Sequence, residues 1–329
     1  MRALVTGGGG FLGGGIAEAL HENNHEVIVV GRHNYSHLPK DIKSFKGDIR
    51  DFEFLRKVFT GVDTVFHTAA LPGIWGKAED FYSINVVGTQ NVIKACLLSG
   101  VQKLIYTSSP SVVYGESSLE GVDETAPYPE KYLCEYPRTK AIAEKLVIEA
   151  NSVDLATISI RPHLIWGPGD PHLVPRILAK ADSGRLVRVG PGKNKVDIIY
   201  IDNAVSAHLK ACEALGVGKP TAGRVYFVSD GEPVKLWDWI DELLKNTGRP
   251  PVKHKISYDL ASILGFIFET LYGFWGLKKE PPMTRFMASQ LATSHYFNIS
   301  RAKNDFGYEP VISPQEGMSR LIQSMSPEY

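Results

Sequence analysis

The chain has 329 residues, 43% of them hydrophobic, so it can bury a core large enough for one α/β unit or two unequal lobes. Its 36 lysines and arginines balance 36 aspartates and glutamates, and no basic cluster runs along the chain, so we expect no nucleic-acid partner. Cys96, Cys134 and Cys212 lie far apart in sequence, which fits neither a disulfide framework nor a metal site and indicates a reducing compartment.

The amino terminus passes directly into an apolar segment, Ala3-Leu4-Val5. It has no charged leader followed by a long apolar run and a cleavage site of small residues. We therefore expect a cytoplasmic protein.

The first half of the chain alternates short β-branched runs with helical patterns, which predicts a parallel sheet with helices on both faces. Apolar residues recur at spacings of three and four in the predicted helices. We expect strands at 3–6, 26–30, 64–68, 103–107 and 156–161, and helices at 14–23, 51–59, 82–98 and 136–150. This order is typical of a Rossmann-like, doubly wound α/β fold.

After Pro168 the pattern breaks up, because prolines punctuate shorter elements. We expect residues 1–168 to form a dinucleotide-binding domain, with later segments returning to it. Residues 169–329 would then form a smaller mixed lobe that binds the substrate. No Ser/Gly-rich linker separates the two parts, so we expect the second lobe to pack against the first.

A glycine-rich loop follows the first predicted strand and opens the first predicted helix. Gly7 permits a tight turn, Gly10 lets the backbone approach a diphosphate, and Gly13 lets the helix pack against the strand. The amino end of the helix favours an anion. In this context the pattern predicts a dinucleotide site, and a glycine turn without a ligand is the alternative.

The second predicted strand ends in Gly31 and Arg32 instead of an acid. A carboxylate would accept hydrogen bonds from both hydroxyls of a free ribose, whereas a guanidinium suits a 2′-phosphate. We therefore expect NADP(H), with NAD(H) as the alternative if Arg32 is only a solvated loop charge. Asp48 lies where it could bind an adenine amino group, or it caps a helix.

Tyr136 and Lys140 lie four residues apart on a predicted helix and therefore share one face. A neighbouring ammonium stabilises a phenolate, so Lys140 can lower the pKa of Tyr136 toward working pH. An ordinary surface pair is the alternative interpretation.

A serine cluster ends the predicted strand at 103–107, at the carboxyl edge of the sheet, where ligands bind in this architecture. A hydroxyl there can donate a hydrogen bond to a substrate oxygen. We choose Ser109, with Ser108 and Ser111 as alternates; all three would otherwise be turn residues.

With these motifs the chain resembles the extended short-chain dehydrogenase/reductase superfamily over nearly its whole length. The residues that carry the resemblance are Thr6, Gly7, Gly10, Gly13, Gly47, Asp48, His67, Thr68, Ala69, Ala70, Asn85, the serine cluster, Tyr136, Lys140, Arg161 and Pro162. The resemblance implies that Tyr136 donates or accepts the proton and that Lys140 holds the nicotinamide ribose. It also implies that Ser109 orients the carbonyl and that Asn85 steadies the proton relay.

The same resemblance implies further contacts to the cofactor and a mode of assembly. The additional cofactor-binding residues would be Phe11, Leu12, Ile49, Ala69, Ala70, Pro162 and Ile165. The helices at 82–98 and 136–150 would pair between two copies in a homodimer. No metal is implied.

Residues 190–203 indicate the branch of the superfamily. Sugar-nucleotide epimerases and dehydratases usually carry an arginine before the aromatic residue here, whereas this chain has Val196 and Asp197. The segment resembles the 3β-hydroxysteroid dehydrogenase branch, with its sterol-4α-carboxylate dehydrogenases and 2-alkyl-3-oxoalkanoate reductases. This implies hydride transfer to or from a secondary alcohol or ketone of a small hydrophobic substrate, steroid-like or a long-chain β-keto or β-hydroxy acid.

Two other functions stay open at this point. One is a sugar-nucleotide epimerase or dehydratase with tightly bound NAD. The other is a non-catalytic NADP-binding sensor or assembly protein, against which the intact Tyr136, Lys140 and serine cluster argue.

Residues 260–277 form a strongly apolar run interrupted by Glu269, which is short for a membrane span. Three interpretations compete: a buried helix of the second lobe, an interfacial helix that places the protein on a membrane, and an apolar lid over a lipid-like substrate. Burial comes first because apolar helices most often belong to the core. The other two would both favour a hydrophobic substrate.

Overall fold

Seven parallel strands form the central sheet of the computed structural model, which describes residues 1–33 and 35–325. Their order is β12-β7-β5-β4-β1-β2-β3. The strands are β1 (Arg2–Thr6), β2 (Glu26–Gly31), β3 (Lys43–Lys46), β4 (Thr64–His67), β5 (Lys103–Thr107), β7 (Ala156–Pro162) and β12 (Arg224–Val228). All five strands predicted in the first half are present as β1, β2, β4, β5 and β7.

The strand order reverses between β1 and β4, which are neighbours in the sheet although β2 and β3 separate them in sequence. From β1 the chain runs outward to β2 and β3, then returns to β4 and continues to β5 and β7 on the other side. Ligands of doubly wound sheets bind beyond the carboxyl ends of the strands at such a reversal. The fold therefore directs attention to the loops that follow β1 and β4.

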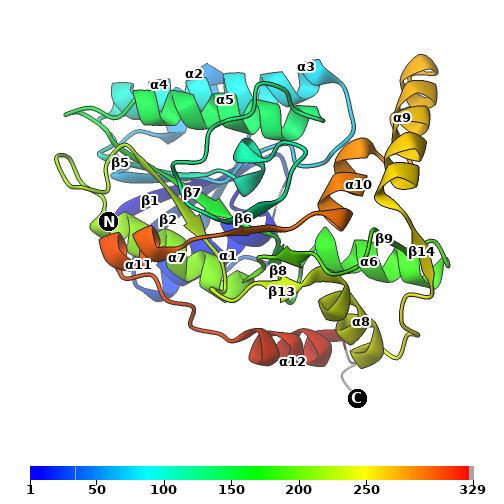
Figure 1. Cartoon of the computed structure of the whole chain (residues 1–329). Helices are drawn as coiled ribbons and strands as arrows, with labels where there is room; N and C mark the ends of the chain where they lie inside the picture. The colour runs from blue at the N-terminus through cyan, green and yellow to red at the C-terminus, as the bar shows by residue number, and fades with distance from the viewer. Residues whose placement is uncertain (34, 326–329) are drawn as a thin grey trace.

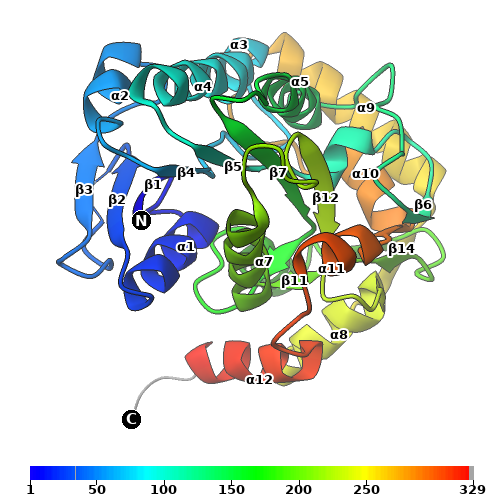
Figure 2. The same ribbon diagram turned by 90° about the vertical axis from the view of Figure 1, so that its left-hand side faces the viewer.

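Helices cover both faces of the sheet (Figures 1 and 2). One face carries α2 (Phe52–Val58), α3 (Ala78–Phe81), α4 (Gly88–Ser99) and α5 (Glu135–Glu149), and the other carries α1 (Phe11–Glu22) and α7 (Ile201–Ala214). Because successive side chains of a strand point to opposite faces, Leu4 packs in the core with α2, α4 and α5, while Ala3 and Val5 pack with α1 and α7. Burial on both faces explains the continuous apolar runs of these strands. The predicted fold class is confirmed.

The helix expected at 82–98 has two parts. A π-helical turn, η1 (Tyr82–Val87), leads into α4, and a short 3₁₀ helix, η2 (Pro110–Val113), follows β5. π-turns widen the helix locally and are frequent at functional sites. This one contains Asn85, whose side chain is described below.

The remaining elements form smaller sheets and helices outside the main sheet. One sheet has the order β13-β10-β15-β6, and two strand pairs are β11-β8 and β14-β9. The strands are β6 (Leu119–Val122), β8 (Ile165–Trp166), β9 (Val187–Val189), β10 (Lys195–Val196), β11 (Ile199–Tyr200), β13 (Val234–Lys235), β14 (His254–Ile256) and β15 (His295–Phe297). The helices are α6 (Leu173–Asp182), α8 (Leu236–Asn246), α9 (Tyr258–Phe274), α10 (Arg285–Ala292), α11 (Ser300–Phe306) and α12 (Pro314–Met325).

Helix α9 is the apolar segment singled out in the sequence, and it is not buried. Figure 1 shows it standing at the edge of the molecule beside α10. Its exposed large apolar side chains, with the residues just after the helix, are Leu260, Ile263, Phe266, Ile267, Leu271, Phe274, Trp275 and Leu277. The buried-helix interpretation is therefore wrong, because an apolar run by itself does not reveal whether another element covers it. Among the described residues, no helix is long and apolar enough to cross a bilayer.

Candidate active site

The glycine loop turns tightly between β1 and α1. Gly7 has a φ of +73°, and its N–H donates to the carbonyl of Val30 on β2 at 2.7 Å. A Cβ atom at Gly7 would lie 2.8 Å from the backbone of Ala69, and one at Gly13 would clash with the carbonyl oxygen of Gly7. Only glycine fits this positive φ and these close approaches without strain.

The loop therefore makes a backbone cradle beside the residues that follow β4. Helix α1 begins at Phe11 with Gly10 as its N-cap residue, and no side chain caps the free N–H groups. Such an amino end attracts a diphosphate through its N–H groups and its dipole. The donor set and the absence of Cβ atoms fit the diphosphate of a dinucleotide. Leu12 is buried in the first turn of α1, and the backbone of Ala69 lies against Gly7.

The end of β2 carries the residues that we associate with the adenosine end of the cofactor. Arg32 is exposed directly after β2. Asp48 forms an ion pair with Arg50 at 2.7 Å, and this hydrogen bond holds the pKa of Asp48 below its usual value, with a smaller contribution from Arg32. The helix-cap alternative for Asp48 is wrong, because Asp51 caps α2 by accepting from Phe54 N–H. Ile49, next to Asp48, is buried in the core.

Tyr35 is a residue near the loop that the sequence analysis missed. A Cβ atom at Gly9 or at Gly31 would clash with the Tyr35 side chain, so its ring lies against the backbone at both places. An aromatic residue four positions after a strand carries no recognisable signal, and only the folded loop brings it there.

Asn85 joins the loop after β4 to α5. Its Oδ1 accepts from Leu71 N–H at 2.7 Å, and its Nδ2 donates to the Leu71 carbonyl at 3.2 Å and to Thr139 Oγ1 at 3.0 Å. Asn85 is buried, and its own carbonyl accepts from Thr89 Oγ1 at 2.6 Å. The residue thus holds the cofactor-side loop against the helix that carries Tyr136.

The three candidate serines differ in what they contact. Ser109 caps η2 by accepting from Ser111 N–H, and its Oγ lies 2.9 Å from Ser111 Oγ. Ser109 also lies close enough to Tyr136 to lower the pKa of its phenol. Ser108 Oγ is buried and has no hydrogen-bond partner among the described residues. Of the three serines, Ser109 is the one whose hydroxyl acts on Tyr136.

Tyr136 lies in the first turn of α5, which begins at Glu135. Burial raises the pKa of Tyr136 above its usual value, and the hydrogen bond from Ser109 offsets part of this increase. The lowering expected from Lys140 is not present in this arrangement, because burial disfavours the phenolate and the ammonium is bound elsewhere.

Lys140 lies one turn further along α5 and is only 3% exposed. Its Nζ donates to the Thr107 carbonyl at 2.5 Å and lies 4.1 Å from the centre of the Tyr106 ring. Burial lowers the pKa of Lys140 to about 7, although the charge of Glu144 opposes this effect. A lysine in this state can lose its proton near neutral pH, so its protonation depends on its neighbours.

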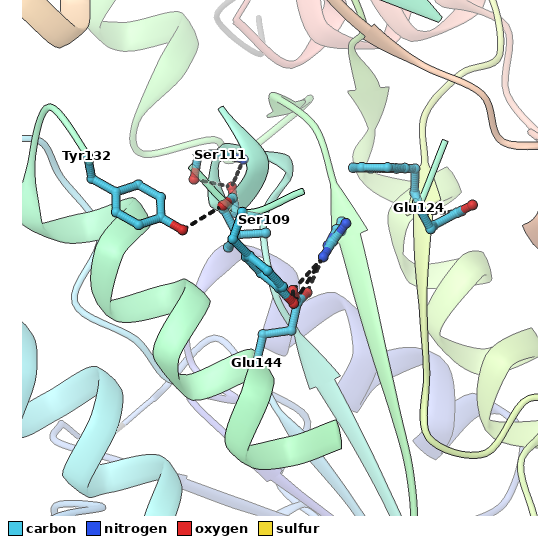
Figure 3. A network of polar contacts seen from close by, with 9 residues as sticks. Ser109, Ser111, Glu124, Tyr132 and Glu144 are labelled. Carbon is cyan, nitrogen blue, oxygen red and sulfur yellow. Dashed lines mark hydrogen bonds and ion pairs between the residues drawn. The ribbon is translucent and has the colours of Figure 1, made fainter. Parts of the chain in front are cut away.

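A buried ion pair adjoins this lysine and was not predicted. Arg161, at the end of β7 beside Pro162, binds both carboxylate oxygens of Glu144 at 2.9 and 2.6 Å. Figure 3 shows Glu144 at one end of a polar network and Ser109 with Ser111 at the other. The sequence held one signal, since Glu144 continues the four-residue spacing of Tyr136 and Lys140. Its partner on β7 was not identifiable.

The predicted site residues thus gather into two groups along the carboxyl edge of the sheet. Tyr136, Lys140 and Ser109 meet at the end of β5, whereas Arg32 and Asp48 lie at the ends of β2 and β3. The glycine loop lies between them at the strand reversal. Pro162 ends β7, and Ile165 begins β8. A molecule that contacts both groups must be long and must carry an anion at its centre, as a dinucleotide does.

Asp197 is a buried structural residue. The sequence analysis noted it because sugar-nucleotide epimerases and dehydratases usually carry an arginine in this segment. It accepts a hydrogen bond from Phe297 N–H at 2.8 Å, and its own N–H donates to the His295 carbonyl. Burial raises its pKa to about 7. The residue therefore ties β15 to the segment before β11.

Comparison with known sequences gives a consistent result. The model of the 3-beta hydroxysteroid dehydrogenase/isomerase family matches residues 4–259. A 2-alkyl-3-oxoalkanoate reductase of Stenotrophomonas maltophilia is 45% identical over 327 residues, which cover 98% of this chain and 99% of the relative. The human sterol-4-alpha-carboxylate 3-dehydrogenase, decarboxylating, is 34% identical over 98% of this chain and 88% of its own length.

Solved structures of related fold are also similar over the whole chain. The structure named gox2253 has a TM-score of 0.79 and 26% identity, covering 98% of this chain and 97% of that one. The UDP-glucuronic acid 4-epimerase of Bacillus cereus, solved in complex with NAD, has a TM-score of 0.75 at 21% identity and covers 98% of both chains. The second likeness shows the fold alone.

Proposed function

This chain belongs to the 3-beta hydroxysteroid dehydrogenase/isomerase family of NAD(P)-dependent oxidoreductases, and from that premise we propose its specific activity. It transfers hydride between NADP(H) and a ketone or secondary alcohol of a hydrophobic substrate, with Tyr136 as proton donor or acceptor. The observation that carries the proposal is the meeting of Tyr136, Lys140 and Ser109 at the carboxyl end of β5, where Lys140 Nζ donates to the Thr107 carbonyl and Ser109 follows two residues later.

The chain's own residues divide the work as follows. Ser109 donates a hydrogen bond to the substrate oxygen and so places it next to Tyr136. Tyr136 gives its phenolic proton to this oxygen during reduction, or takes the proton from the alcohol during oxidation. Lys140 binds the nicotinamide ribose, and its ammonium stabilises the phenolate once it turns from the Thr107 carbonyl. Asn85 keeps α5 aligned with the loop after β4.

The cofactor, when bound, supplies or accepts the hydride. Gly7, Gly10 and Gly13 would hold its diphosphate at the amino end of α1. The preference for NADP(H) is supported by Arg32, whose guanidinium follows β2 where a carboxylate would repel a 2′-phosphate. Asp48 is already paired with Arg50, and Arg32 is exposed directly after β2.

The hydrophobic character of the substrate is supported by the relatives and by the apolar surface near the site. Relatives carry names of enzymes that act on 2-alkyl-3-oxoalkanoates and on sterol carboxylates. Trp75, in the loop after β4, donates to the Leu277 carbonyl at 2.9 Å and packs edge-on against Tyr272. The apolar end of α9 therefore lies beside the loop that begins at Ala69.

Peripheral membrane contact through residues 260–277 is part of the proposal. The exposed apolar side chains of α9 recur at helical spacing, as in Leu260, Ile263 and Ile267. Lys278 and Lys279 are exposed just beyond them, where lysines favour an anionic lipid surface. A helix of this kind lies in the interface plane without crossing it.

A homodimer is also proposed, with α4 and α5 as the shared surface. Leu97 and Leu98 on α4 are exposed large apolar residues on the outer side of these helices. Their burial in a second copy would explain this exposure. Sedimentation or light scattering of the purified protein would give twice the chain mass, and a monomer at micromolar concentration would contradict the dimer.

A panel of ketones and alcohols of graded chain length, assayed with NADPH and NADH, tests the proposal. We expect turnover of long-chain or steroid-like ketones, with NADPH preferred, followed by the absorbance of the reduced nicotinamide. Copurified NAD that does not exchange, together with binding of a sugar nucleotide, would favour an epimerase or dehydratase. Cofactor binding with no turnover of any substrate would favour the sensor.

A further inference from the structure

Tyr136, Lys140 and Glu144 form a stripe along α5, because each follows the previous one by four residues, about one helical turn. The side chain of Glu144 is 0% exposed. Acids are almost never fully buried unless they are paired. Glu144, one helical turn after Lys140, is therefore a buried charged residue to which the proposed mechanism gives no role.

The carboxylate of Glu144 is fixed by three donors. Arg161 donates to it from Nε at 2.9 Å and from Nη2 at 2.6 Å, and the hydroxyl of Tyr128 donates at 2.7 Å (Figure 3). The Arg161 guanidinium also faces the rings of Tyr128 and Phe227 at 5.7 and 5.0 Å from their centres. These donors satisfy both carboxylate oxygens of Glu144.

The groups that face Lys140 from other elements are uncharged. On β5 these are the Thr107 carbonyl and the Tyr106 ring, whose hydroxyl pKa is raised by burial. On β4, His67 has its pKa lowered to about 3 by burial and by the charge of Lys140. Glu144 on α5 opposes the loss of the Lys140 proton, while Arg161 on β7 is engaged by that carboxylate.

We propose that Glu144 is a positioning residue whose carboxylate, fixed by Arg161 and Tyr128, keeps the Lys140 ammonium charged at neutral pH. Burial alone would drive Lys140 toward the neutral amine. A neutral amine could neither stabilise the Tyr136 phenolate nor donate three hydrogen bonds. The inference rests on the proposed function, since Glu144 acts only through Lys140 and Tyr136.

A purely structural role for the ion pair predicts something different. A buried pair can stabilise a fold without touching catalysis, and replacing both partners by neutral residues of similar volume is often harmless to stability. The double variant Glu144→Gln/Arg161→Met therefore separates the two roles. It removes both charges without leaving one of them buried and unpaired.

The direct test is the titration of Lys140 by NMR in protein labelled with ¹³C at lysine Cε, without cofactor or substrate. The Lys140 resonance is assigned by its disappearance in Lys140→Met. We expect a midpoint near neutral pH in the unmodified protein, and a fall of about one pH unit in Glu144→Gln/Arg161→Met, as the loss of a nearby opposite charge requires. Tyr132→Phe, which leaves Glu144 and its three donors in place, is the matched control with an unchanged midpoint.

A folded double variant with an unmoved Lys140 midpoint would overturn the inference. If that variant does not fold, Glu144→Gln/Arg161→Gln offers a hydrogen-bonding neutral pair for the same titration. The pH profile of kcat/KM gives the second measurement, and its alkaline limb should move to lower pH by the same amount. The titration needs no substrate, so it tests the role of Glu144 even if the protein reduces no ketone. Failure to reduce any ketone would refute the proposed function alone.

Discussion

On α5 the charged side chains of Lys140 and Glu144 are buried, whereas on α9 the apolar side chains of Ile263 and Phe274 are 57% and 84% exposed. Both helices depart from the usual distribution of residues, and each departure costs free energy that the fold must offset. Both departures agree with the proposed roles of the two helices. In the proposed mechanism the buried charges of α5 lie beside the reacting atoms, and the exposed apolar side chains of α9 are available for membrane contact. The two helices can therefore be tested against each other.

Replacing Lys140 should have the largest effect, because the residue serves both the cofactor and Tyr136. For Lys140→Met we expect kcat/KM to fall by about 10²–10⁴-fold, the usual range for loss of an acid–base group. The affinity for NADPH should weaken as well, measured by quenching of protein fluorescence. Ile263→Ser on α9 should change neither kcat/KM for a soluble ketone nor the affinity for NADPH. Equal losses in the two variants would break the comparison.

The two helices should also respond differently when their stability is measured. Glu144→Ala leaves Arg161 buried and unpaired, so we expect the free energy of unfolding to fall by about 3–5 kcal/mol. Phe274→Ser removes an exposed side chain and should change it by less than about 0.5 kcal/mol. Urea unfolding of both variants checks the contrast. A large loss in Phe274→Ser would mean that another copy or element covers α9.

Strong local signals made part of the fold predictable. The strands β1 and β5 follow from short buried apolar runs, and the turn at Gly7 follows from its spacing to Gly10 and Gly13. The strand β12 (Arg224–Val228) was missed because it lies in the irregular second half and reaches the sheet only by pairing with β7. Strand β3 is an exposed edge strand with no apolar pattern.

The candidate site shows the same limit. Tyr136 and Lys140 were predictable because four residues on one helix fix their relation. The closeness of Ser109 to Tyr136 depends on how the chain leaves β5, and the ion pair of Glu144 depends on a partner on β7. Contacts between distant segments need the fold, as does the exposure of α9.

Arg32 adds a third case to the comparison, because its charge is exposed and stays in contact with water. Arg32→Ala should weaken NADPH binding by roughly tenfold or more, the equivalent of one charge-assisted hydrogen bond, and should leave NADH binding nearly unchanged. Stability should not change. Dissociation constants for both cofactors, measured by titration calorimetry, decide the matter. Equal weakening of both cofactors would remove the case for NADP(H).

Membrane binding is the property that depends on α9 alone. Cosedimentation with vesicles that contain anionic lipid should be reduced in Phe274→Ser, because each buried apolar side chain contributes about 1.5–3 kcal/mol to membrane binding. Added salt should weaken binding through Lys278 and Lys279. Glu144→Gln/Arg161→Met serves as the control and should bind vesicles normally. Absence of vesicle binding by the unmodified protein would rule out the membrane contact.

The most direct test of the account is the rate of ketone reduction by Tyr136→Phe. This change keeps the aromatic ring and removes the hydroxyl proposed to transfer the proton. We predict that kcat/KM with NADPH falls by about 10²–10⁴-fold while the dissociation constant for NADPH stays unchanged. Turnover equal to that of the unmodified enzyme on every accepted ketone would contradict the account.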